Sequence, residues 1–191
     1  MAKEGQGKLE AITASLPREK RGPPPVELWN PPFCGDIDMR IAADGTWFYQ
    51  KTPIGRHALV QLFASVLKRE DDKYFLVTPV EKLGIVVEDA PFLAVEMRRR
   101  DANLSFRTNM DDWIDAGPGH PLQFEPEAET GGLKPYLHVR RNLWAKVTRA
   151  LSYDLVEAGE ERVIGGTPMF GVASGGDFFV MAEADALKEF A

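Results

Sequence analysis

A repeated pattern of basic and apolar residues restricts the fold of this chain more than any other feature. The matching residues are Arg56 with Arg140, Leu59 with Leu143, Phe63 with Val147 and Leu67 with Leu151. Each pair lies 84 positions apart (140 − 56 and 151 − 67), and a constant offset without gaps indicates that an amphipathic helix has been duplicated. We therefore expect two copies of one small unit, with a cleft between them that favours ligand binding.

An aromatic-rich hairpin follows each expected helix. Residues 74–79 after the first helix correspond to residues 169–174 after the second, now 95 positions apart (170 − 75), which indicates an insertion near residues 157–167. Strands that curve around one helix make an α+β roll. The fold prediction is therefore an α+β chain of two tandem repeats, each made of curved antiparallel strands plus one helix, with the second repeat larger.

The first 35 residues differ from the rest, because clustered prolines prevent both helix continuation and strand pairing. Trp29 and Phe33 are expected to be buried against the folded body, while residues 1–8 stay mobile, since only the two aromatic residues carry enough apolar area to offset the cost of ordering. The expected parts are an arm over residues 1–35, a first repeat domain over 36–89 and a second repeat domain over 90–191.

Turn signals predict three hairpins. Asp44-Gly45 is a strong signal for a hairpin over residues 37–49, where apolar residues alternate with polar ones. Two more hairpins are expected over residues 92–108 and 170–181. The second of these contains Ser174-Gly175-Gly176, which resembles an anion-binding nest but is better interpreted as a tight hairpin turn.

Two helices are expected from apolar periodicity. The first opens at Pro53, with Thr52 offered as its N-cap, and the second runs from about Arg141 to near Gly159, a glycine suited to the C′ position. The apolar face of the first helix consists of Leu59, Leu62, Phe63, Val66 and Leu67.

Composition limits the classes of function. Hydrophobic residues make up 44% and charged residues 27%, as in ordinary soluble globular proteins. The net charge of −6 disfavours nucleic acid and anionic membranes as partners, and the run Arg98-Arg99-Arg100 is interpreted as a solvated strand edge. No segment approaches the roughly 20 apolar residues that span a bilayer. Cys34 is the only cysteine, so we expect a cytoplasmic protein without disulfides, in which this thiol is buried as a small apolar group.

The sequence contains no recognisable catalytic or metal-binding motif. His57, His120 and His138 lack HExxH spacing, and the GxSxG elbow, the P-loop and the GxGxxG motif are absent. We therefore expect no metal and no cofactor, and the leading prediction is a non-catalytic binding protein. Two alternatives stay open: a small hydrolase that uses Asp89 or Glu81 as a base near His138, or a protein-interaction scaffold marked by a broad apolar patch.

Polar and aromatic residues at the ends of apolar strands, together with the two arginines of the repeat, are the candidate ligand site. Guanidinium groups bind phosphate or carboxylate bidentately, so the expected ligand is a small anion. An aromatic ring could stack on a base. The candidate ligand-binding residues are Trp47, Arg56, Thr78, Glu81, Lys82, Asn109, Tyr136, His138 and Arg140.

Several stretches of the chain carry a resemblance to a known family. They are DIDMRI at 36–41, DGTWF at 44–48, TPIGR at 52–56, LVQLF at 59–63, LVTPVEK at 76–82, EDAPF at 88–92, Thr108-Asn109 and Pro135-Tyr136. In these stretches the chain is similar to a bacterial family of unknown function, number twelve eighty-five in the domain-of-unknown-function series. The resemblance implies a duplicated core and a second domain similar to pleckstrin-homology folds. It also implies a nucleotide-like ligand at the domain interface, a part in signal transduction and a signalling protein partner.

Overall fold

The computed structural model describes residues 24–127 and 130–185 and divides into two compact units, Met1–Pro91 and Phe92–Ala191. Each unit has its own buried hydrophobic residues. No helix among the described residues is long and apolar enough to cross a bilayer. The mobility expected for residues 1–8 falls outside the described residues.

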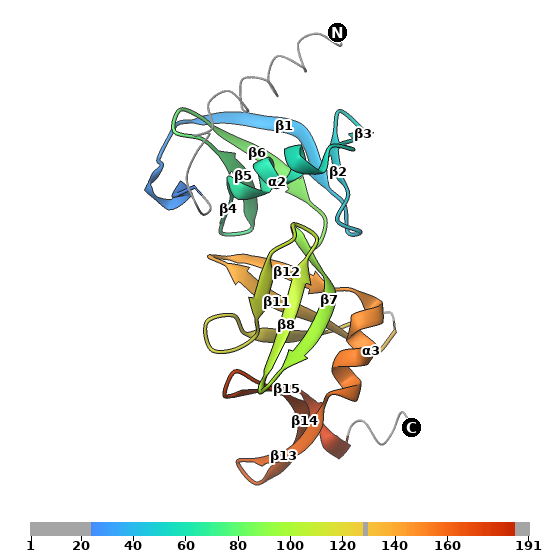
Figure 1. Ribbon diagram of the computed structural model, residues 1–191. Helices are drawn as coiled ribbons and strands as arrows, with labels where there is room; N and C mark the ends of the chain where they lie inside the picture. Colours follow the sequence, from blue (N-terminus) through green and yellow to red (C-terminus); the bar gives the residue numbers. More distant parts are fainter. Residues whose placement is uncertain (1–23, 128–129, 186–191) are drawn as a thin grey trace. The chain divides into compact units, whose positions relative to one another are not determined.

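The N-terminal unit is a six-stranded sheet with one α-helix packed on it (Figure 1). Its elements are η1 Val26–Leu28, β1 Phe33–Ile41, β2 Trp47–Tyr49, β3 Thr52–Pro53, α2 His57–Ser65, β4 Leu67–Glu70, β5 Lys73–Val77 and β6 Lys82–Val87. The strand order is β3-β2-β1-β6-β5-β4, and all neighbours are antiparallel except β1 and β6, which are parallel. The hairpin predicted around Asp44-Gly45 is confirmed as β1–β2.

The core of this unit forms between α2 and the sheet. Phe63 on α2 stacks on Trp47 of β2, with ring centroids 6.4 Å apart and an interplanar angle of 22°. Both side chains are buried, and so are Leu76 of β5 and Leu83 of β6. The predicted start of the helix at Pro53 is wrong, because Thr52–Pro53 pair with β2 as the short strand β3 and the helix begins four residues later.

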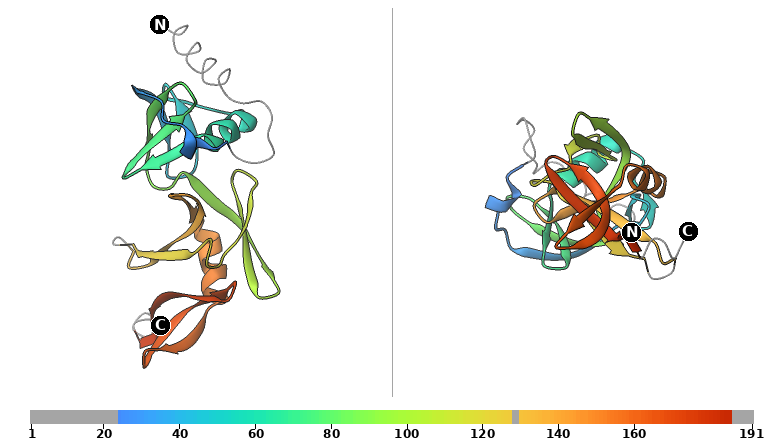
Figure 2. Two further views of the ribbon diagram at one scale, coloured as in Figure 1. Left: turned by 90° about the vertical axis from the view of Figure 1, so that its left-hand side faces the viewer. Right: turned by 90° about the horizontal axis from the view of Figure 1, so that it is seen from below.

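The C-terminal unit contains a second six-stranded sheet, a three-stranded sheet and one α-helix (Figure 2). Its elements are β7 Phe92–Arg100, β8 Asn103–Thr108, β9 Trp113–Asp115, β10 Leu122–Pro126, β11 Leu133–Arg140, β12 Leu143–Val147, α3 Arg149–Glu157, β13 Glu160–Ile164, β14 Thr167–Ser174 and β15 Asp177–Glu183. The larger sheet has the order β10-β11-β12-β7-β8-β9, with β12 and β7 parallel. The predicted hairpins over residues 92–108 and 170–181 are confirmed as β7–β8 and β14–β15.

The two large sheets have the same topology. Read from its other end, the second sheet runs β9-β8-β7-β12-β11-β10, so β7 to β12 correspond in order to β1 to β6. In each sheet the first and sixth strands lie side by side in parallel and join two antiparallel three-stranded meanders. The chain is therefore a tandem duplication of a six-stranded sheet.

The helices do not share this equivalence, so the helix-based alignment of the repeats is wrong. Leu59 and Phe63 lie on α2, whereas Leu143 and Val147 lie on strand β12. The second helix, expected from about Arg141, begins at Arg149 and follows the sixth strand, whereas α2 follows the third. Apolar residues four apart point to one side of a helix and equally to one side of a strand, so this spacing does not distinguish the two structures.

The arm packs through residues other than those expected. Val26 of η1 and Pro31 are buried, Trp29 is half-buried, and Phe33 is 55% exposed with its ring edge-on to Phe75 at 6.0 Å. The expected burial of Phe33 is thus wrong, because Phe33 begins β1 instead of ending a loop that folds inward. The expected burial of Cys34 is also wrong, because Cys34, the residue that follows Phe33 in β1, is exposed.

One buried hydroxyl connects the two sheets of the C-terminal unit. Ser174 Oγ accepts a hydrogen bond from the Leu104 N–H (2.8 Å) and donates one to the Ala116 carbonyl (2.7 Å). Ser174 ends β14, and Gly175 and Gly176 follow with φ of 62° and 89°, conformations that favour glycine. The interpretation of this motif as a hairpin turn is confirmed, and its serine additionally fastens the turn to the larger sheet.

Candidate functional site

The predicted site residues are divided between the two units. Trp47, Arg56, Thr78, Glu81 and Lys82 belong to the N-terminal unit, and Asn109, Tyr136, His138 and Arg140 belong to the C-terminal unit. Within the units the structure brings together two subsets. The first is the turn between β5 and β6, and the second is the outward face of β11.

The β5–β6 turn is organised by the Thr78 hydroxyl. This buried oxygen accepts hydrogen bonds from the N–H groups of Val80 (3.3 Å) and Glu81 (3.2 Å), which is the turn-forming arrangement of threonine. Lys82 at the end of the turn bonds the Glu70 carboxylate at 2.8 Å. Hydrogen bonds from Lys82 and Lys68 hold the pKa of Glu70 below its usual value. These contacts stabilise the turn. Trp47, another predicted site residue of this unit, is buried in the core.

The β11 face presents three of the predicted residues. Tyr136, His138 and Arg140 are half-buried and alternate with buried residues, as expected for a strand with one face in the core. The His138 ring has Nδ1 3.2 Å from the Gly119 carbonyl and Nε2 against the Arg141 carbonyl, so it braces two loops. Asn109, on a separate loop, accepts a hydrogen bond from the Leu93 N–H at 3.0 Å.

Arg56 and Arg140 have different environments. Arg56 is exposed at the N-cap of α2 and forms no ion pair with any described residue. The Arg140 side chain is 20% exposed, lies 5.0 Å from the centre of the Phe92 ring and has Asp112 at 3.9 Å. Burial lowers the pKa of Arg140, while Asp112 opposes that shift. The Arg140 guanidinium thus covers core aromatic surface.

Alanine substitutions should reflect this difference. Arg140→Ala removes a partly desolvated cation–π contact and the packing of a long aliphatic stem, so we expect a loss of about 2 kcal/mol in the free energy of unfolding. Arg56→Ala should change it by about 0.5 kcal/mol or less, as for an ordinary surface position. Urea denaturation of both variants measures the two values. Equal values for the two variants would contradict the environments described.

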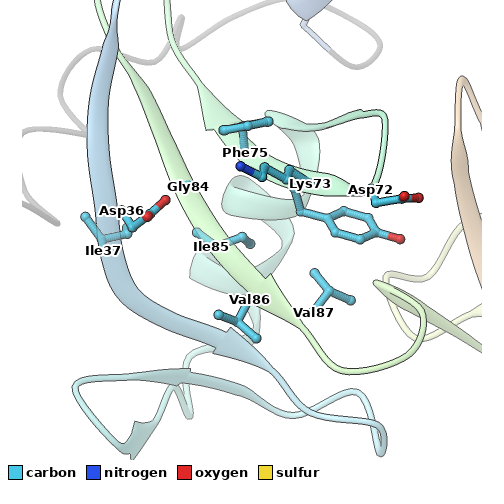
Figure 3. A pocket seen from close by; sticks show the side chains of 10 residues that line it. Asp36, Ile37, Asp72, Lys73, Phe75, Gly84, Ile85, Val86 and Val87 are labelled. Atoms are coloured by element: carbon cyan, nitrogen blue, oxygen red, sulfur yellow. The ribbon is translucent and has the colours of Figure 1, made fainter.

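A pocket of about 360 Å³ lies in the N-terminal unit, on strands β1, β5 and β6 (Figure 3). It forms where the pairing of β1 with β6 is irregular, since the register shifts between Asp36 and Arg40. Its lining is mixed, with charged groups beside apolar ones. The lining residues are Asp36, Ile37, Asp72, Lys73, Tyr74, Phe75, Gly84, Ile85, Val86 and Val87.

Gly84 determines the position of one charged group of the pocket. Asp36 and Phe75 both pair with Gly84, from the strands on its two sides, so all three lie in one row across the sheet. A Cβ atom at position 84 would overlap the Asp36 carboxylate, which therefore lies over the glycine backbone. Gly35, with φ of 95°, precedes Asp36 at the irregular start of β1.

Two opposite charges in this pocket are without protein partners. Among the described residues, no hydrogen bond or ion pair reaches the carboxylate of Asp36 or the ammonium of Lys73. In Figure 3 the Lys73 nitrogen points toward β6 and the Asp36 side of the pocket. Sequence reasoning missed these residues. Gly84 was the available signal, because a glycine inside an apolar strand often marks a close approach of another group.

Several carboxyl groups of the described residues have a lowered pKa, and hydrogen bonding is the first cause in each. Such carboxylates act as ionised acceptors. These groups are Asp44, Glu70, Glu88, Glu96 and Glu127. No group of three or more His, Cys, Asp or Glu residues in the described part of the chain could hold a metal ion.

Comparison with known proteins identifies the family. The N-terminal domain model of DUF1285, a domain of unknown function, matches residues 24–90, and the C-terminal domain model matches residues 91–181. The structure of a DUF1285 family protein from Silicibacter pomeroyi DSS-3 is 48% identical, with a TM-score of 0.81, over 93% of this chain and 97% of that chain. A DUF1285 family protein from Shewanella baltica OS155 is 34% identical, with a TM-score of 0.52, over 63% of this chain and 91% of that one.

None of the curated proteins compared with the chain matches it. The family models together cover both units, and the Silicibacter protein matches nearly the whole length of the chain. The family predicted from the sequence is thus confirmed, and the chain belongs to the DUF1285 family of unknown function.

Proposed function

We propose that this protein is a non-catalytic small-ligand-binding protein whose ligand occupies the pocket of the N-terminal unit. The observation that carries the proposal is the Lys73 ammonium, which no described residue pairs, in a pocket of about 360 Å³ lined by both apolar and charged groups. Ligand sites are typically concave, mostly apolar and supplied with a few polar groups that fix orientation. The volume lies near the lower end of the usual range, roughly 300–1,000 Å³, which favours a small metabolite.

The ligand should carry one acidic group. Among the described residues, Lys73 is the only cationic side chain that lines the pocket, and the carboxylates of Asp36 and Asp72 line it as well. A ligand with several negative charges would be repelled by these carboxylates. Among nucleotide-like and other anionic metabolites, those with a single carboxylate or phosphate group suit the site best.

A thermal-shift screen against carboxylated and phosphorylated metabolites tests the proposal. A ligand present at 100 times its dissociation constant adds about 2.7 kcal/mol to the free energy of unfolding. Lys73→Met should abolish the stabilisation, because it removes the cation and keeps the stem. Lys51→Met is the matched control, since Lys51 is an exposed lysine of the same unit that does not line the pocket. Stabilisation that survives Lys73→Met would place the ligand elsewhere.

We further propose a pleckstrin-homology-like character for the C-terminal unit and a cytoplasmic part in signal transduction. Support for the first comes from the order of elements, six strands of one sheet followed by α3. The single cysteine and the net charge of −6 support a reducing compartment and a protein away from anionic membranes. A protein partner would then respond to the bound ligand.

A further inference from the structure

We infer that the pocket of the N-terminal unit takes a small zwitterion, a molecule with one ammonium and one acidic group such as a free amino acid. The inference rests on the proposed function, because it assigns a ligand class to the same pocket. Two opposite charges that no described residue pairs, Asp36 and Lys73, carry it, together with the glycine whose lack of a side chain lets the Asp36 carboxylate lie over the strand.

Strand geometry places both charges on one face of the sheet. Asp36, Gly84 and Phe75 form one row across β1, β6 and β5. Lys73 precedes Phe75 by two residues on β5, and side chains two apart in a strand point to the same face. The Asp36 carboxylate and the Lys73 ammonium therefore border one site from two strands, with the bare backbone of Gly84 between them.

Asp36 and Lys73 are exposed and lie on β1 and β5 with β6 between them, so the absence of an ion pair between them leaves both charges open to a ligand. Oppositely charged side chains that meet in a protein commonly neutralise each other, as Lys82 and Glu70 do in this unit at 2.8 Å. Asp36 and Lys73 line one pocket without forming such a bond. A zwitterion supplies both missing partners at once, with its ammonium on Asp36 and its acidic group on Lys73. An anion without an amino group would leave the Asp36 carboxylate unpaired and close to its own charge.

Apolar groups around the two charges define the rest of the ligand. Phe75 is buried and belongs to the row of Gly84, and Val86 is exposed two residues further along β6. A compact aliphatic or aromatic side chain of the ligand would cover Val86 and rest against Phe75. Amino acids with apolar side chains fit this combination of one cation, one anion and a small apolar surface.

The experiment uses the full chain and the twenty standard amino acids as probes. The most stabilising one is titrated by isothermal calorimetry beside its decarboxylated amine and its deaminated acid. We expect the zwitterion to bind at least tenfold more tightly than either analogue. In ¹⁵N-labelled protein, the backbone amide signals of Gly84 and Phe75 should shift on titration, which locates the site.

Three variants separate the two charges. Asp36→Asn should weaken zwitterion binding at least tenfold and leave the deaminated acid unaffected, whereas Lys73→Met should weaken both. Gly84→Ala should resemble Asp36→Asn, because the added methyl group displaces the carboxylate from its position over the strand. Asp38→Asn is the matched control, since Asp38 is an exposed carboxylate on β1 that does not line the pocket.

The possible outcomes distinguish the inference from the proposed function. If the deaminated acid binds as tightly as the amino acid, or Asp36→Asn binds like the wild type, the zwitterion assignment is overturned and the binding function stands. If no amino acid shifts the Gly84 and Phe75 signals but a carboxylated or phosphorylated metabolite does, the zwitterion assignment is likewise overturned and the binding function stands. If no probe of either kind shifts them, the inference and the proposed function both fail.

Discussion

Gly171→Ala is expected to lower the free energy of unfolding by about 3 kcal/mol or more. A Cβ atom at position 171 would overlap the backbone carbonyl oxygen of Phe179 on β15 and would meet the Phe178 ring at 2.9 Å. A backbone oxygen in a paired strand cannot move aside without disturbing the pairing of β14 with β15. Overpacking of this kind commonly costs about 1–3 kcal/mol, and a clash with backbone belongs at the upper end. The midpoint of urea denaturation, at unchanged slope, measures the loss.

Gly84→Ala is the informative comparison for Gly171→Ala. A Cβ atom at position 84 would also overlap another atom, but that atom belongs to the exposed and flexible Asp36 side chain. The carboxylate can rotate away, so we expect a change of about 1 kcal/mol or less, including the entropy gained when glycine is replaced. Equal destabilisation by the two substitutions would show that the mobility of the contacted atom is not what determines the cost.

Ser174→Ala is expected to lower the free energy of unfolding by about 3 kcal/mol. The substitution leaves the Leu104 N–H without its acceptor and the Ala116 carbonyl without its donor, and both residues are buried. Each buried polar group that loses its partner costs about 1–3 kcal/mol. Loss of hydrogen-exchange protection should concentrate at Leu104 and along β14 and β15. Chemical denaturation followed by circular dichroism gives the total.

Ser152→Ala provides the matched control in the same unit. Ser152 Oγ donates to the Thr148 carbonyl at 3.1 Å, within the first turn of α3, and the side chain is only half-buried. Water can replace that bond and alanine favours the helix, so we expect a change of about 0.5 kcal/mol or less. If Ser174→Ala were as mild as Ser152→Ala, the hydroxyl would not be what fastens the two sheets together.

Turn chemistry predicted the hairpins of this chain better than periodicity predicted its helices. Asp44-Gly45 and Gly175-Gly176 can adopt backbone conformations that most residues avoid, so they mark hairpins whatever surrounds them. Leu143, by contrast, belongs to a four-residue spacing that both a helix and a strand accept. The alternating burial of β12 shows that tertiary packing resolved this ambiguity in favour of the strand.

The candidate site was less accessible to sequence reasoning than the fold. Thr78 and Asn109 attracted attention as polar residues at strand ends. In the structure the Thr78 hydroxyl forms a turn, and the Asn109 side chain accepts a hydrogen bond from the Leu93 N–H of β7. Asp36 and Lys73 are 37 positions apart (73 − 36) and meet in one pocket only because β1 and β5 flank β6. No local pattern reveals such a meeting. Gly84 was the one local signal, because a glycine inside an apolar strand often marks the close approach of another group to the backbone.

The parallel pairing at the centre of each large sheet has a consequence for synthesis and folding. In the N-terminal unit this pairing joins Ile41 to Val87, and in the C-terminal unit it joins Phe92 to Ala145. The strand pairings between residues far apart in the sequence thus lie in the middle of each sheet. The outer strands pair with strands that are close to them in the sequence. Local hairpins close in microseconds, whereas distant pairings wait for the chain between them. A ribosome must therefore release the sixth strand of each large sheet, β6 or β12, before the central parallel pairing of that sheet can form, and the N-terminal sheet can finish while the C-terminal one is still being made.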